Sequence, residues 1–169
     1  MIWAIAIAVV LAGSLAYLLW KQRKEVKTEQ MPKRSGPPPV LNTKQLQIQA
    51  YERLILLTDR IALPNLISRT NQPGTSAKDM QLLLTQIIKQ EFEHNITQQI
   101  YVSAPAWDAL RNLKEQNLLL VNQVAAILPA EASGGDLNKS LLELLMNNPK
   151  LSLDQVVSDA LSFEAKKLF

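Results

Sequence analysis

The chain of 169 residues contains no cysteine, which excludes disulfide bonds and metal sites built on thiolates. The absence of cysteine is compatible with a reducing cytosol but does not require one. Aromatic residues make up only 5% of the chain, and there is one histidine, His94. A site that needs two imidazoles would therefore need two copies of the chain.

Sequence motifs of the common enzyme classes are also missing. There is no glycine-rich phosphate-binding loop, no G-x-S-x-G nucleophile elbow and no cysteine nucleophile. We therefore expect no catalytic residue and no cofactor. The serines that precede helical segments are interpreted as helix caps.

Charged side chains are absent from residues 1–20, MIWAIAIAVVLAGSLAYLLW. A helix of about nineteen residues rises about 28 Å, close to the roughly 30 Å hydrocarbon core of a bilayer. Trp3 at one end, and Tyr17 and Trp20 at the other, are typical of the membrane–water interface. A signal peptide would begin with basic residues, and none precede this segment. We therefore predict an uncleaved transmembrane helix over residues 1–20.

The residues that follow are rich in basic side chains. Between positions 21 and 34 two acidic residues oppose six basic ones, which we expect to contact lipid headgroups: Lys21, Arg23, Lys24, Lys27, Lys33 and Arg34. Basic flanks resist translocation, so the N-terminus is expected outside and residues 43–169 in the cytosol, in a single-pass protein. Residues 21–42, with three consecutive prolines, are interpreted as a juxtamembrane linker.

The overall charge of +3 and the pI of about 9.2 derive from this linker. Residues 21–34 carry a net charge of +4, whereas residues 43–169 carry −1. A nucleic-acid-binding domain would need a basic face on its folded part. We therefore expect no nucleic-acid partner.

Residues 43–169 show apolar side chains at helical spacing, which predicts an all-α domain. With the transmembrane helix, the expected fold is one membrane span plus a cytosolic bundle of four to five helices. The expected helices cover about 43–61, 77–98, 104–128, 137–147 and 153–169, and Pro64 either ends the first or starts a short one. Their expected caps are Ser76, Ser103, Asp136 and Ser152, the last in a capping box with Gln155.

Three further features of the predicted bundle depend on local composition. The second half of the segment 104–128 is apolar nearly all round, which places it in the centre of the bundle or at a contact surface. Residues 130–135 are expected to form a flexible loop. Residues 99–102 are interpreted as a bend into an extended piece.

The densest group of polar residues is Glu91, His94, Asn95 and Gln98, within EFEHNITQQ. On a continuous helix, Glu91 and Gln98 lie one turn before and one turn after His94, on the face of Ile87. This spacing predicts that the imidazole points toward the packed side.

Three interpretations of this polar cluster remain open. It is a partly buried hydrogen-bond network, a polar hot spot for a partner protein, or a site of metal or acid–base chemistry. Glu91-x-x-His94 matches half of a carboxylate di-metal motif, which a homodimer would have to complete. No metal site is expected within a single chain.

The segments YERLILLTDRI at 51–61 and EFEHNITQQIYVS at 91–103, together with Trp107, carry a resemblance. The chain resembles an uncharacterised family of small, single-span, inner-membrane-anchored helical proteins of Bacteroidota-type bacteria. The resemblance covers most of residues 1–128 and implies a bacterial inner-membrane location. It also implies that the EFEHN segment is a hallmark of the family, and it implies no activity.

The sequence favours a protein–protein interaction module that acts as an adaptor, accessory subunit or assembly factor of an inner-membrane complex. Its expected partners are membrane lipid and either another protein or further copies of the chain. One alternative is a metal-binding or enzymatic site around Glu91 and His94 in a homodimer. The other is a sensor of anionic lipid surfaces that uses the basic flank.

Overall fold

The computed structural model describes Tyr17, Trp20, Lys21 and residues 42–169. The chain divides into two units, residues 1–40 and 41–169. In the first unit the rings of Tyr17 and Trp20 lie 6.3 Å apart, and both side chains are exposed, as is Lys21. Among the residues described, no helix is long and apolar enough to cross a membrane. The rest of the expected span and five expected lipid contacts lie outside the described residues: Arg23, Lys24, Lys27, Lys33 and Arg34.

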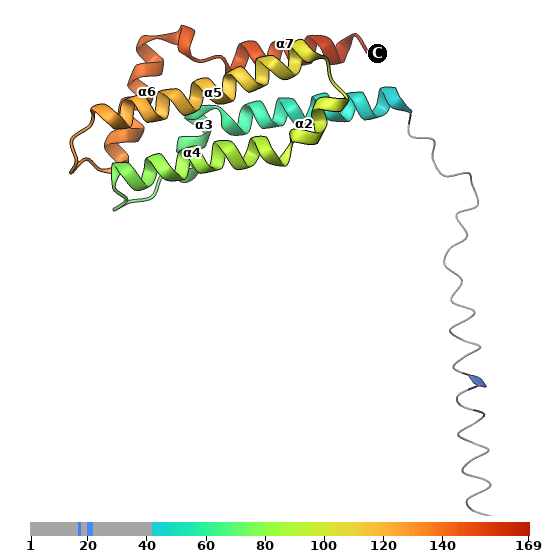
Figure 1. Ribbon diagram of the computed structural model, residues 1–169, viewed down its shortest axis with the longest axis horizontal. Coiled ribbons are helices and arrows are strands. Elements are labelled where there is room, and N and C mark those ends of the chain that lie inside the picture. The colour runs from blue at the N-terminus through green and yellow to red at the C-terminus, as the bar shows by residue number, and fades with distance from the viewer. Residues whose placement is uncertain (1–16, 18–19, 22–41) are drawn as a thin grey trace, which may run out of the picture. The chain divides into compact units, whose positions relative to one another are not determined.

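Residues 42–169 fold into helices joined by short turns, which confirms the all-α class (Figure 1). The α-helices are α2 (Thr43–Ile61), α3 (Leu63–Thr70), α4 (Ala77–His94), α5 (Ala104–Ile127), α6 (Gly134–Asn147) and α7 (Asp154–Lys166). Two 3-10 helices, η1 (Ile96–Ile100) and η2 (Pro149–Leu151), lie between them. The expected four to five helices were too few, because Pro64 begins a separate helix and this range holds six α-helices.

Helix α5 is the centre of the bundle and contacts α2, α4, α6 and α7. This position was one of two alternatives predicted for the second half of α5, in which Leu119 and Ile127 are 54% and 82% exposed. The buried stripe of α4, a helix that packs on both α5 and α6, contains Met80, Leu84 and Ile88, each 0% exposed. At the end of α4, the ring of Phe92 packs 5.0 Å from that of Trp107 on α5. Full burial of such side chains stabilises a fold by about 1.5–3 kcal/mol each, so the α4–α5 contact is a major part of the core.

The C-terminus of α2 ends inside the core, where Ile61, Ala62 and Leu63 are all buried. The last carbonyls of a helix have no partner within that helix. Pro64 has no N–H group, so it cannot bond the carbonyl of Arg60 four residues earlier.

Three side chains, two from α3 and one from α5, supply the missing donors at this end of α2. Arg69 Nη2 donates to the carbonyl of Arg60 at 2.5 Å, and Asn65 Nδ2 donates to that of Asp59 at 3.2 Å. The carbonyl of Ile61 accepts from Nδ2 of Asn117, a buried residue of α5, at 2.8 Å. The last four carbonyls of α2 are therefore all bonded within the protein, and Asn117 fixes α5 against this end.

The first turns of α4 and α6 pair with each other through an isolated bridge between Ser76 and Ser133. The amide of Gly134 donates to the carbonyl of Thr75 at 2.7 Å, and the amide of Ala77 donates to that of Ala132 at 2.9 Å. A Cβ at position 134 would lie only 3.1 Å from Cβ of Met80 and 3.2 Å from the Thr75 carbonyl. Glycine is favoured there because a larger residue would force its close neighbours to move.

This pairing corrects the expected start of α6. Ser133, rather than Asp136, is the N-cap, and its hydroxyl accepts from the amide of Asp136 at 3.2 Å. The carboxylate of Asp136 in turn accepts from the amide of Ser133 at 2.9 Å, which completes a capping box. The expected flexible loop 130–135 therefore ends in the first turn of α6.

Two smaller expectations were also wrong. Residues 96–100 form η1, so the expected extended piece at 99–102 does not form. Helix α7 starts after Leu153 and has no capping box, because Gln155 bonds forward to Asp159 at 2.9 Å instead of back to Ser152.

Replacement of Asn117 by alanine should lower the free energy of unfolding by about 1–3 kcal/mol, because the Ile61 carbonyl would remain buried without a donor. Chemical denaturation of the two proteins measures this difference. Asn112→Ala, an exposed asparagine on the same helix, is the matched control and should change stability by less than about 0.5 kcal/mol. Equal effects of the two substitutions would contradict the role assigned to Asn117.

Candidate functional site

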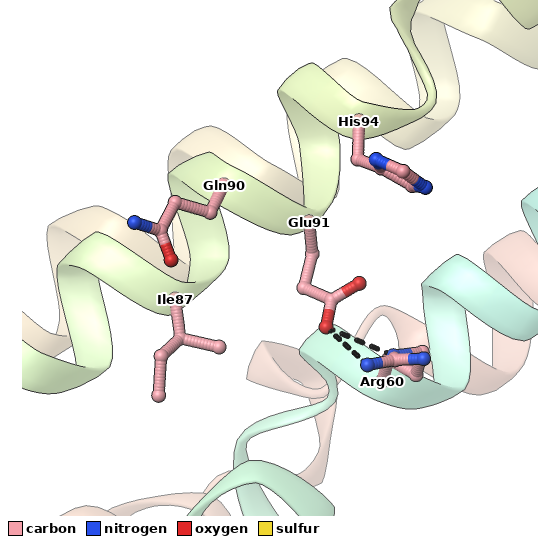
Figure 2. A pocket seen from close by; sticks show the side chains of 5 residues that line it. All are labelled: Arg60, Ile87, Gln90, Glu91 and His94. Atoms are coloured by element: carbon pink, nitrogen blue, oxygen red, sulfur yellow. Dashed lines mark hydrogen bonds and ion pairs between the residues drawn. The ribbon is translucent and has the colours of Figure 1, made fainter. Parts of the chain in front are cut away.

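A shallow hollow of about 300 Å³ lies between α2 and α4 on the surface of the bundle. Arg60 in the last turn of α2 forms one side, and four residues of α4 form the other: Ile87, Gln90, Glu91 and His94. Figure 2 shows Glu91 pointing across the hollow to Arg60, with His94 one turn further along α4. The hollow thus combines a carboxylate, a guanidinium, an imidazole and an amide around an isoleucine side chain.

The ion pair across the hollow uses one oxygen of Glu91. Both Nη2 and Nε of Arg60 approach Oε1 of Glu91, at 2.6 and 2.9 Å. The Arg60 side chain is 46% exposed and the Glu91 side chain 16% exposed, so water screens much of their attraction. Within residues 42–169, Oε2 of Glu91 and the imidazole of His94 have no hydrogen-bond partner. These two groups remain available to an incoming molecule.

The structure brings together only two of the four residues in the predicted polar cluster, Glu91 and His94. Asn95 is buried and donates from Nδ2 to the carbonyl of Glu91 at 2.9 Å, so it ends the helix. Gln98 lies in η1, bonds to Thr97 and is absent from the lining of the hollow. The cluster failed to form as expected because α4 ends at His94, which breaks the helical spacing between His94 and Gln98.

The expected orientation of His94 toward the packed side was also wrong, since the side chain is exposed. Ile87, used to place it, lies at the edge of the core and is only half-buried. The core stripe of α4 instead continues from Ile88 through Phe92 to Asn95. A buried hydrogen-bond network around His94 is therefore absent.

The arrangement is poor for a metal ion. Among the residues that the structure describes, no three His, Asp or Glu side chains are placed to hold one. The guanidinium of Arg60 is bound to the carboxylate of Glu91, and a metal ion would have to displace this cation. Arg60 was not predicted as a site residue because it is 31 positions from Glu91.

A second polar group, which the sequence did not reveal, joins α2, α5 and α7. The hydroxyls of Tyr51 and Ser103 both donate to Oε2 of Glu164, at 2.6 and 2.5 Å. The Tyr51 hydroxyl accepts from the amide of Ser103 at 3.2 Å, and the Ser103 hydroxyl accepts from the amide of Ala106. We call Tyr51, Ser103 and Glu164 the hydroxyl clamp. Every member is bonded within the domain, so the clamp is structural.

The pKa values in the clamp shift in opposite directions. Hydrogen bonds from Ser103 and then Tyr51 lower the pKa of Glu164, because they stabilise the carboxylate. Burial, followed by the bond to Glu164, raises the pKa of Tyr51. The folded protein therefore favours an ionised glutamate and a neutral phenol at neutral pH.

The chain belongs to a family of unknown function, DUF7935, which matches residues 1–168. This membership confirms the expectation of an uncharacterised family. Comparisons with curated proteins and with solved structures give no match.

The lowered pKa of Glu164 predicts a loss of stability in acid. A carboxylate with a lowered folded-state pKa stabilises the fold above its unfolded value, 4.5. This contribution disappears as the pH falls through the lower folded-state value. Glu164→Gln should therefore reduce the free energy of unfolding at pH 7, and its difference from the wild type should narrow below about pH 4.5. Denaturant titrations across this pH range measure the difference.

The control for the acid titration is Glu143→Gln on α6, an exposed side chain outside the clamp. This variant reports the effect of removing one surface charge. If the free energies of unfolding of the wild type and Glu164→Gln differed by the same amount from pH 7 into acid, an ionised Glu164 in the clamp would be contradicted.

Proposed function

We propose that this chain is a membrane-anchored helical interaction module, which binds a partner protein through the hollow formed by Arg60, Ile87, Gln90, Glu91 and His94. In this proposal residues 1–20 span the bacterial inner membrane, the N-terminus is outside, and residues 43–169 lie in the cytosol. The module acts as an adaptor, accessory subunit or assembly factor of an inner-membrane complex.

The exposed imidazole of His94 beside the Arg60–Glu91 ion pair carries this proposal. Small-molecule sites bury most of their ligand. This hollow opens to solvent between two helices, so it would leave much of a small molecule exposed. A partner protein would cover the hollow and exclude water from its ion pair. Arginine flanked by apolar surface is typical of the few residues that dominate binding energy.

The membrane location is supported by the sequence around residue 20. Twenty uncharged residues are followed by six basic ones within the next fourteen positions. Exposed Tyr17, Trp20 and Lys21 have the order expected at the boundary of a bilayer. Anchoring also favours weak contacts between proteins, because tethering to one surface raises their effective concentration.

A reporter enzyme fused after Phe169 should be active in the form that requires the cytoplasm, because the basic flank holds this side inside. Paired fusions of a cytoplasmic and a periplasmic reporter to the full chain measure the orientation. Replacement of all six basic residues between positions 21 and 34 by glutamine should weaken the preference for the cytoplasmic orientation. A periplasmic readout from the native sequence would contradict both the orientation and the cytosolic partner.

His94→Ala should leave the melting temperature nearly unchanged, because the side chain is exposed and unbonded within the domain. It should reduce recovery of the partner by about tenfold or more if the imidazole is a hot spot. Crosslinking of the tagged full chain in native membranes, followed by quantitative mass spectrometry, compares the recovered proteins. Arg60→Ala should reduce recovery of the same protein.

Lys139→Ala is the control for partner binding, since this lysine is exposed on α6 and does not line the hollow. A partner that is lost with His94→Ala and Arg60→Ala but kept with Lys139→Ala supports the hollow. Recovery of the same proteins by all four chains would contradict it. If the recovered partner is a differently tagged copy of this chain, the module is a homo-oligomer.

A further inference from the structure

One end of the bundle combines exposed apolar side chains with lysines. The bonds of Tyr51 and Ser103 to Glu164 hold the N-terminal half of α2, the start of α5 and the last turns of α7 together. Figure 1 shows the start of α2, the start of α5 and the C-terminus at the same end. Helix η1, which contacts α2, precedes this start of α5. Because residues 1–41 join the bundle at the start of α2, we call this region the tether end.

Three large apolar side chains of the tether end are exposed. Ile100 is 72% exposed, Phe163 is 63% exposed and Ile96 is 45% exposed. Two of them come from η1 and one from α7, so they do not belong to a single helix face. Exposed isoleucine and phenylalanine side chains at the same end of a domain are suited to a surface that is covered in use.

Lysines accompany these apolar residues. Nζ of Lys167 lies 4.2 Å from the centre of the Phe163 ring. Two further exposed lysines are Lys166, the last residue of α7, and Lys44, in the first turn of α2. The exposed acids in the neighbouring turns are Glu52, Glu93, Asp108 and Asp159. Asp108 is paired with Arg111, Asp159 accepts from Gln155, and Glu164 is held in the clamp. An aromatic ring beside an ammonium group is suited to the boundary between lipid headgroups and acyl chains.

The tether end is also the part of the bundle closest in sequence to the basic flank. Residues 22–41 separate it from Lys21 in the sequence. In the proposed function the anchor holds this end of the domain near the membrane, and tethering raises the effective concentration of a contact that would be weak between separate molecules.

We propose that the tether end, defined by Lys44, Ile96, Ile100, Phe163, Lys166 and Lys167, rests on the surface of an anionic bilayer. The isoleucines and the phenylalanine enter the headgroup layer, and the lysines bind phosphate groups of the lipids. This inference rests on the membrane anchoring in the proposed function and extends it to the folded domain. It fixes which end of the bundle faces the membrane and leaves the hollow between α2 and α4 for the partner.

Lipid contact can be measured site by site because the chain has no cysteine. A single cysteine at Ile100→Cys carries a fluorophore, and the full chain is reconstituted in vesicles that contain brominated phosphatidylcholine, with or without phosphatidylglycerol. The matched control is Ile127→Cys, an isoleucine that is 82% exposed at the other end of α5 and has the acidic Glu131 nearby in sequence.

We expect bromine to quench the Ile100 label in vesicles with phosphatidylglycerol, while the Ile127 label remains unquenched. The pair Lys166→Glu and Lys167→Glu should reduce quenching at Ile100 to the level of Ile127. A label at Phe163→Cys provides an independent reading from α7 and should be quenched like the Ile100 label.

Three results would overturn the inference. One is equal quenching of the Ile100 and Ile127 labels, or no quenching of either, in a chain that floats with the vesicles. The second is quenching that does not depend on phosphatidylglycerol. The third is a change in the fluorescence of the Ile100 label in detergent without lipid, if that change grows with protein concentration. Such a change would indicate that a second copy of the chain covers this surface. A chain that fails to float with the vesicles would contradict the anchoring itself, and the inference with it.

Discussion

The buried end of α2 is the constraint on which the rest of the bundle depends. The chain turns at Ala62, where Ile61, Ala62 and Leu63 are buried, so the carbonyl of Ile61 needs a donor from the protein. Asn117 reaches it from the central helix and thereby fixes the position of α5 along α2. The same turn determines where Arg60 lies, because its carbonyl is held by Arg69 while its side chain extends to Glu91. The geometry of the candidate site thus follows from the way in which α2 ends.

Local signals in the sequence were sufficient to predict several helices. The bounds of α2 at Thr43 and Ile61 were predicted from apolar spacing, and the caps Ser76 and Ser103 from residue type. In each case the signal lies within a few residues of the boundary that it defines. The start of α6 was different, because the two glycines after Ser133 resemble a loop. Only the close approach of Gly134 to Thr75, from another part of the chain, makes glycine favourable there.

The polar groups were harder to predict from the sequence, because their partners are distant along the chain. The Tyr51–Glu164 bond joins residues 113 positions apart, and the bond from Asn117 to Ile61 joins residues 56 apart. No local pattern distinguishes such residues from exposed polar side chains. His94 was placed toward the core because a helical spacing was extended past the point where the helix stops. The end of α4 is set by Asn95, whose side chain takes the Glu91 carbonyl. Sequence reasoning therefore located the polar segment but assigned its side chains to the wrong environments.

The structure separates polar residues that hold the fold from polar residues that remain available. Asn95, Asn117 and the hydroxyl clamp have their partners inside the domain, and their replacement acts on stability. His94 and the free oxygen of Glu91 have none among the described residues, so they contribute little to folding. The EFEHN segment contains both kinds, with Asn95 directly after His94. In the proposed function His94 is a binding residue, because it lies exposed beside the Arg60–Glu91 ion pair at the end of α4 and takes no part in the packing of the bundle.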